Sequence, residues 1–165
     1  MQRALIMVLI LLIALVPTAV SLAEHDTSGG TAPLQTGPYL TVNETSNVRG
    51  GPGLGFYVIG VLYSGNIVPV LGVSADSGWW YVNTEFGEGW VSNLTTTPTG
   101  TAGVTVIDPG PTATVTAGLL NVRDGAGTNA LVLGRLARGQ QVLVIAQNST
   151  GTWLQVRWGY GIGWV

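Results

Sequence analysis

Beyond its N-terminus, the chain alternates short apolar runs with turns rich in glycine, asparagine and serine. In the first half, β-branched and aromatic residues dominate 57–63 and 67–73, and Ser64-Gly65 separates the two runs. Such runs, broken by a glycine turn, predict a β-hairpin. Two shorter strands are predicted at 79–83 and 89–92. No segment after residue 23 repeats apolar residues at helical spacing, so the pattern predicts an all-β protein.

The same pattern returns in the second half of the chain without a gap. Asn47-Val48-Arg49 aligns with Asn121-Val122-Arg123, and the equivalent hairpin strands are 131–137 and 141–147. The other identical pairs are turn glycines and strand positions, including Trp79 with Trp153 and Trp90 with Trp164. A repeat of this length indicates two copies of one small domain, which we place at 39–95 and 116–165. The second copy stops at Val165 where the first continues, so we expect it to be truncated.

Two segments have the composition of spacers. Residues 96–115 are rich in threonine, proline and glycine and contain few large apolar groups, which predicts an extended linker between the copies. Residues 24–38 are predicted to be a second spacer, in front of the first copy.

The N-terminal segment 1–23 predicts export. Arg3 precedes an apolar stretch at 4–16, and Ser21-Leu22-Ala23 supplies small residues at −3 and −1 of a cleavage site, as in a signal peptide. The apolar span 4–23 also reaches the roughly 20 residues that cross a bilayer, so an uncleaved anchor helix is the alternative. Both interpretations predict an extracytoplasmic protein, either secreted or tethered to the outer face of the membrane.

Charge and cysteine content narrow the function classes. The six basic residues are all arginines and the net charge is −2, which does not fit a nucleic-acid-binding protein. No cysteine is present, so disulfides cannot support the domains. The first copy is acidic and the second basic, so we expect their ligands to differ.

Catalytic chemistry finds little support in the sequence. The single histidine, His25, lies in the spacer, and there is no cysteine nucleophile, so neither a serine or cysteine triad nor a metal site is predicted. Glu85 and Glu88 flank a hairpin turn and have no counterpart in the second copy. We therefore expect no enzyme, no metal and no cofactor.

The combined motif resembles a known family. Asn-Val-Arg-x-Gly-x-Gly, a glycine-bounded hairpin and a closing Gly-x-Gly-Trp-Val occur in both copies and are similar to the bacterial SH3 domain. This resemblance implies two tandem SH3-like β-barrels. It also implies a binding module of bacterial cell envelopes, often attached to cell-wall hydrolases and often credited with binding peptidoglycan.

Strand alternation selects the candidate ligand-binding residues. If Val82 and Val156 face the core, Trp79 and Trp153 point outward and could stack against a sugar or peptide. Alternatively, these rings cover the barrel mouth or pack under a loop. Trp90 and Trp164, opposite in parity to Val91 and Val165, are secondary candidates.

Further candidates lie in turns. Tyr57, Trp158 and Tyr160 are not matched by identical residues in the other copy and could tune ligand choice, or could pack against their own turns. Arg49 and Arg123 could clamp a peptide carboxylate, but are expected rather to bind carbonyls of their own loops.

Three functions remain open from the sequence. The leading hypothesis is an exported module that binds cell-wall peptidoglycan or an envelope peptide. The alternatives are the targeting arm of a wall hydrolase whose catalytic domain is missing from this chain, and a protein-binding scaffold or sensor. No nucleic-acid partner is expected, and a membrane partner only through the N-terminal segment.

Overall fold

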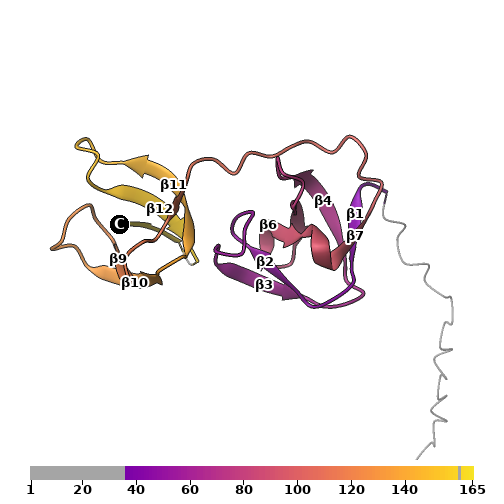
Figure 1. Cartoon of the computed structure of the whole chain (residues 1–165), viewed down its shortest axis with the longest axis horizontal. Helices are drawn as coiled ribbons and strands as arrows, with labels where there is room; N and C mark the ends of the chain where they lie inside the picture. Colours follow the sequence, from indigo (N-terminus) through magenta and orange to yellow (C-terminus); the bar gives the residue numbers. More distant parts are fainter. Residues whose placement is uncertain (1–35, 160) are drawn as a thin grey trace, which may run out of the picture. The chain divides into compact units, whose positions relative to one another are not determined.

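The structure, a computed structural model, describes residues 36–159 and 161–165 (Figure 1). The predicted signal or anchor segment at 1–23, most of the 24–38 spacer and Tyr160 lie outside the described residues. In the described part all regular structure is β-strand apart from one short 3-10 turn, so the all-β prediction is confirmed. The described part contains no helix that is long and apolar enough to span a membrane.

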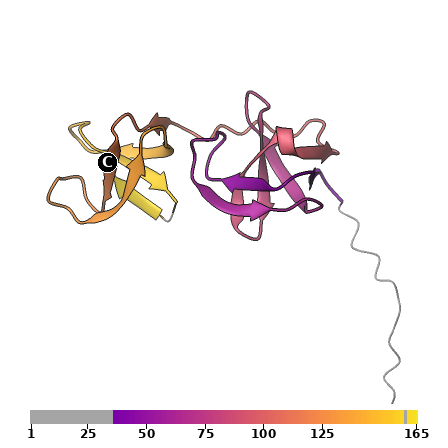
Figure 2. The ribbon, with the colours of Figure 1, turned by 60° about the horizontal axis from the view of Figure 1, so that its bottom comes forward.

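Residues 39–99 form the first sheet, in the strand order β3-β2-β6-β5-β4-β1-β7. The 3-10 turn η1 (Asn93–Thr95) joins β6 to β7 and is visible as a short coil in Figure 2. The strand bounds are β1 Tyr39–Val42, β2 Ser46–Arg49, β3 Val58–Leu62, β4 Ile67–Val73, β5 Trp79–Thr84, β6 Gly87–Ser92 and β7 Thr96–Thr99.

Residues 112–164 form the second sheet, in the order β10-β9-β13-β12-β11-β8. Strand for strand, this order repeats that of β3-β2-β6-β5-β4-β1. The strand bounds are β8 Thr112–Thr114, β9 Leu119–Arg123, β10 Val132–Ala137, β11 Gln141–Gln147, β12 Leu154–Trp158 and β13 Gly161–Trp164.

Irregularities of pairing recur at equivalent places in the two sheets. β4 shifts register against β5 between Val70 and Gly72. β11 shifts against β12 between Val144 and Ala146, which align with Val70 and Gly72 in the sequence repeat. A β-bulge bends a strand and increases its twist, so bulges at equivalent positions give both sheets the same local bend.

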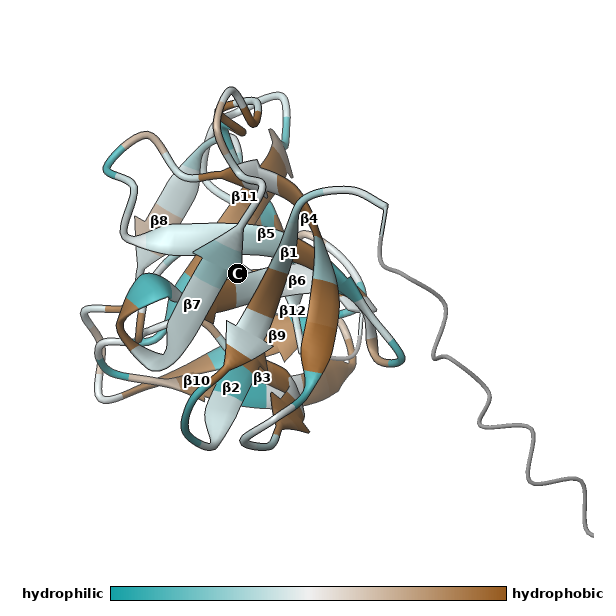
Figure 3. Cartoon of the chain, turned by 90° about the vertical axis from the view of Figure 1, so that its right-hand side faces the viewer, coloured by the Kyte–Doolittle hydropathy of each residue, from teal (hydrophilic) through white to brown (hydrophobic). Residues whose placement is uncertain are grey.

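Each sheet encloses its own apolar core. Along β4, Val68 and Val70 are buried while Ile67 and Pro69 are exposed, which is the period of two expected for a strand with one buried face. Figure 3 shows the hydrophobic residues along β1 and β4. The first core consists of Leu40, Val42, Val48, Leu62, Val68, Val70, Val82 and Val91, and the second of Val115, Val122, Leu136, Val142 and Val156.

The structure corrects the prediction that 96–115 is only an extended linker. β7 at its start pairs with β1, and β8 at its end pairs with β11. Between them, Val104 packs against the first core, and Val73 exchanges backbone hydrogen bonds with Thr105 and Ile107, at 3.0 and 2.8 Å. Composition misses this because exposed backbone groups at a strand edge accept an extended segment of almost any sequence.

Candidate binding grooves

The first sheet carries an open groove where the start of β5 meets β2 and the end of β6. On β2, Ser46 and Val48 are buried, so Asn47 and Arg49 fall on the opposite face, toward the groove. The groove has a volume of about 240 Å³. We call it the first groove; its lining residues are Thr45, Ser46, Asn47, Arg49, Leu54, Trp79, Ser92, Leu94 and Thr95.

A hydrogen-bonded turn fixes Trp79 at the start of β5. The backbone N–H of Trp79 donates to the Ser74 hydroxyl at 3.0 Å, and the Ser74 N–H donates to the Trp79 carbonyl at 2.8 Å. Asp76 accepts from the Ser74 hydroxyl and from the Gly78 N–H, at 2.6 and 3.0 Å, and these bonds lower the pKa of Asp76. Trp79 therefore presents a partly exposed ring from a rigid turn, while Trp80 packs against the core.

Arg49 organises the glycine-rich loop beside the first groove. Its Nη1 donates to the carbonyls of Leu54 and Phe56, at 2.9 and 2.7 Å. Burial lowers the pKa of Arg49 from its ordinary value. The guanidinium therefore holds its own loop. This is the role that the sequence favoured over a clamp for a peptide carboxylate.

The second sheet carries a groove at the equivalent place, which we call the second groove. It has a volume of about 270 Å³. In the repeat, Asn121, Arg123, Thr128 and Trp153 are the equivalents of Asn47, Arg49, Leu54 and Trp79 of the first groove. The lining residues are Leu119, Leu120, Asn121, Arg123, Thr128, Thr152, Trp153 and Val165.

A different residue builds the equivalent turn in the second sheet. Asn148 stands where the first sheet has Ser74, and its Oδ1 accepts from the N–H groups of Thr152 and Trp153, at 2.9 and 3.1 Å. The Asn148 N–H donates to the Trp153 carbonyl at 3.0 Å. Two unlike side chains thus hold a tryptophan in the same position, partly exposed in both sheets.

Trp90 and Trp164 differ in exposure, although the sequence made both of them secondary candidates for ligand binding. Val91 is in the core, as expected, but Trp90 on the other face is only 3% exposed. The Tyr81 ring packs on it, with centroids 5.0 Å apart and planes tilted by 40°. Trp90 is therefore not an exposed ligand platform, whereas Trp164 is partly exposed.

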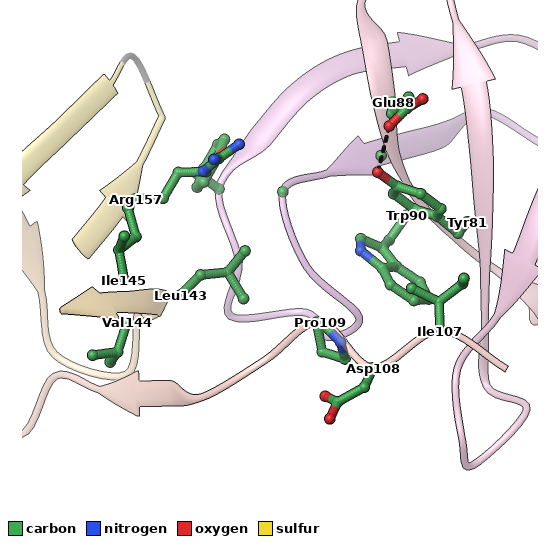
Figure 4. Close-up of a pocket in the computed structure, with 13 residues that line it drawn as sticks. Tyr81, Glu88, Trp90, Ile107, Asp108, Pro109, Leu143, Val144, Ile145 and Arg157 are labelled. Atoms are coloured by element: carbon green, nitrogen blue, oxygen red, sulfur yellow. Dashed lines mark hydrogen bonds between the residues drawn. The ribbon is translucent and has the colours of Figure 1, made fainter. Parts of the chain in front are cut away.

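Tyr81 itself is held by Glu88, whose carboxylate accepts the phenol hydrogen bond at 2.6 Å (Figure 4). Burial, this bond and the negative charge of Glu88 raise the pKa of Tyr81 to about 12. The sequence did not single out Tyr81. Its position opposite Trp90 on β5 and β6 could have been found only from the register of the two strands.

The remaining predicted residues divide between packing and open surface. Trp158 packs against the second core, where a Cβ on Gly134 would come within 2.3 Å of its ring, so this glycine makes room for the indole. Tyr57 is partly buried, and Tyr160 lies outside the described residues. Trp158 is thus accounted for by packing against its own sheet.

Two exposed leucines beside the first groove were not predicted from the sequence. Leu54 is 77% exposed and Leu94 is 88% exposed, and both line the groove with Trp79. Leu119 is 64% exposed in the second groove. Large apolar side chains gathered on the surface beside an aromatic ring are typical of contact surfaces. A leucine inside the glycine and proline loop 50–55 is the signal that could have revealed the first of them.

Comparison with known proteins identifies the first of these regions. A family model described as "Bacterial SH3 domain" matches residues 44–96, from the turn before β2 to the first residue of β7. Residues 44–96 are a bacterial SH3 domain. All the residues that line the first groove therefore lie within this SH3 domain.

One curated relative matches much of the chain. The Bacillus subtilis (strain 168) protein named "Putative N-acetylmuramoyl-L-alanine amidase YrvJ" is 30% identical over 130 residues, which cover 78% of this chain and 24% of that protein. The chain thus spans about a quarter of the length of the relative that it matches.

Among solved structures, NlpC1 and NlpC2 from Trichomonas vaginalis are similar to this chain. The match with NlpC1 has a TM-score of 0.32 at 16% identity and covers 81% of this chain and 45% of that one. The match with NlpC2 has a TM-score of 0.31 at 15% identity and covers 79% and 46%.

Proposed function

We propose that this protein is an exported binding module that attaches to cell-wall peptidoglycan through both grooves. The observation that carries the proposal is that a partly exposed tryptophan, an asparagine and an arginine recur at equivalent places in the two sheets, each beside an open groove. The similarity to a protein named as an N-acetylmuramoyl-L-alanine amidase supports the cell wall as the setting.

We further propose that residues 112–165 are a second bacterial SH3 domain. The strand order, the matching bulges and the equivalent groove support this proposal. Export is proposed from the apolar N-terminal segment, as a cleaved signal peptide or as an anchor that keeps the protein on the outer face of the membrane.

The chemistry of the first groove suits an uncharged part of a wall polymer. Its polar lining consists of hydroxyl and amide groups, no carboxylate lines it, and Arg49 donates to the chain's own carbonyls. An indole face with hydroxyl and amide partners can stack on a sugar ring or a peptide backbone and hydrogen-bond its edges. Binding is the role we assign to these residues, without catalysis.

Two weak sites on one chain fit a repetitive polymer. When the first groove is occupied, the second encounter with the same polymer becomes intramolecular, so avidity can exceed either affinity by about 100-fold or more. Loss of both tryptophans should therefore reduce retention far more than loss of either one.

Co-sedimentation with insoluble peptidoglycan tests this proposal. The full chain, kept in a mild detergent, is compared with Trp79→Ala, Trp153→Ala and the double variant. Tyr63→Ala is the matched control, because Tyr63 is 63% exposed and lines neither groove. We expect retention by the wild type and by the control, partial retention by the single variants and little by the double variant. A folded wild type that stays in the supernatant would contradict wall binding.

The second candidate is that these domains are the targeting arm of a cell-wall hydrolase. The observation that favours it is the match to about a quarter of the amidase-named relative. The coding sequence downstream of Val165 decides this point: a catalytic domain there supports the targeting arm, and an immediate stop codon excludes it.

A further inference from the structure

The two grooves differ in charge at one equivalent pair of positions. In the first sheet, Val61 pairs with Asn47 across β2 and β3. In the second sheet, Arg135 pairs with Asn121 across β9 and β10. Both asparagines line their grooves, so Arg135 lies next to a lining residue of the second groove, where Val61 lies next to the equivalent residue of the first.

Arg135 is oriented by Asn121, a residue that lines the second groove. Its Nε donates to Oδ1 of Asn121 at 3.2 Å, and its Nη groups make no hydrogen bond to another described residue. Because Asn121 offers its oxygen to Arg135, its amide nitrogen is left to donate elsewhere. The side chain is exposed, so the free end of the guanidinium is open to solvent.

The second arginine of this groove is also less engaged than its counterpart. Arg49 donates to two loop carbonyls, whereas Arg123 donates to one, that of Ala130 at 2.7 Å. The carbonyl equivalent to that of Leu54 belongs to Thr128, and Arg123 does not bind it. Within the described residues, neither Arg123 nor Arg135 forms an ion pair.

We propose that the second groove binds a carboxylate and that Arg135 determines this specificity. Asn121, Arg123 and Trp153 line the groove, and the guanidinium of Arg135 is held beside it by its hydrogen bond to Asn121. Arg123 keeps donors beyond the one that binds the Ala130 carbonyl, and Trp153 supplies an apolar surface. A guanidinium fork matches the two oxygens of a carboxylate. Asp124, the one acidic residue of 112–165, follows Arg123 in the chain and favours a singly charged group over a dianionic phosphate.

This inference rests on the proposed function of the grooves and assigns them different parts of the ligand. The first groove, with Leu54, Leu94 and Trp79, takes an uncharged, partly apolar group. The second takes the free carboxylate of a peptide. A wall polymer that carries peptides offers both kinds of group, so one polymer molecule could occupy both grooves.

An NMR titration of the ¹⁵N-labelled full chain in a mild non-ionic detergent tests the proposal. The probes are N-acetyl-alanyl-alanine with a free carboxylate, its C-terminal amide and glycerol 3-phosphate, at constant ionic strength. We expect the carboxylate peptide to shift the Trp153 indole and Asn121 side-chain signals, and the amide to shift them much less. Equal binding of the amide, or stronger binding of the phosphate, would overturn the carboxylate assignment.

Reciprocal variants test the role of Arg135. Arg135→Val, which copies the first sheet, should weaken the carboxylate response about two- to fivefold, the scale of one exposed ion pair. Arg135→Lys keeps the positive charge but lacks the planar guanidinium, so its affinity for the carboxylate peptide should lie between those of the wild type and Arg135→Val. Val61→Arg should give the Trp79 signal a carboxylate response that the wild type lacks. An unchanged affinity in Arg135→Val, with the second core's signals intact, refutes the proposal even if peptidoglycan retention persists. If the wild type binds the carboxylate peptide but is not retained by insoluble peptidoglycan, the proposed function is refuted and the carboxylate assignment stands.

Discussion

One added methyl group at Gly163 should damage the packing of the second sheet. A Cβ there would lie 2.4 Å from Cγ1 of Val122 and 3.1 Å from the carbonyl oxygen of Arg123. Val122 is fully buried and backbone cannot give way cheaply, so Gly163→Ala must displace β13 from β9.

The magnitude follows from two opposing effects. Overpacking of this kind costs about 1–3 kcal/mol. Replacing glycine also restricts the unfolded chain, which returns about 0.4–1 kcal/mol. We expect a net loss of about 1–2 kcal/mol, which at a urea m-value of about 1 kcal/mol/M lowers the unfolding midpoint by about 1–2 M.

Gly161→Ala is the matched control, because it lies two residues earlier in the same strand. A Cβ on Gly161 meets nothing within 4 Å and its φ is not positive. This variant should therefore be unchanged or slightly more stable. Gly89→Ala should repeat the destabilisation in the first sheet, where its Cβ would lie 3.0 Å from the Arg49 carbonyl oxygen and overlap the side chains of Val48 and Ile59.

Urea titration followed by the tryptophan indole NMR signals reads the two sheets separately. Three of the six tryptophans lie in 79–90 and three in 153–164. Gly163→Ala should lower the midpoint of the second set. If Gly163→Ala proves as stable as Gly161→Ala, the close packing of β13 against β9 is refuted.

Three further predictions concern the first sheet. Arg49→Met should destabilise it by about 1 kcal/mol, because two loop carbonyls lose their donor; an unchanged urea midpoint would show that the loop does not need the guanidinium. Gly72→Ala should free the segment around Ile107, because its Cβ would lie 2.2 Å from the Ile107 side chain; faster amide exchange at Ile107, with the sheet intact, is the expected result, and unchanged exchange would contradict the docking. Tyr81 should ionise near pH 12, so the stability gained from its neutral phenol bound to Glu88 is full below pH 10 and is lost as the pH rises through 12. Ultraviolet titration should lose its latest phenolate step in Tyr81→Phe, and a wild type whose tyrosines all ionise together near pH 10 would argue against this hydrogen bond.

Local pattern alone determined most of the β-structure. Alternation predicted the hairpin strands, and the inward positions of Val82 and Val156, both fully buried, follow from the same period of two. The internal repeat predicted that Trp79 and Trp153 occupy equivalent places, and each of them lines a groove together with an asparagine and an arginine of its own sheet. These features depend on backbone geometry within a few residues, so the order of apolar and polar residues is sufficient to predict them.

Only the tertiary structure decided what each side chain does. Parity cannot tell that Trp90 is covered by Tyr81, because that contact depends on the register of β5 against β6. Strand parity also cannot tell that Arg49 donates to two loop carbonyls, whereas the Nη groups of Arg135 bond no described residue and only its Nε binds Asn121. The linker shows the same limit, because its hydrogen bonds to Val73 use backbone groups that every residue carries. A side chain's availability for a ligand depends on neighbours brought close by the fold, and one sequence read along its length does not contain that information.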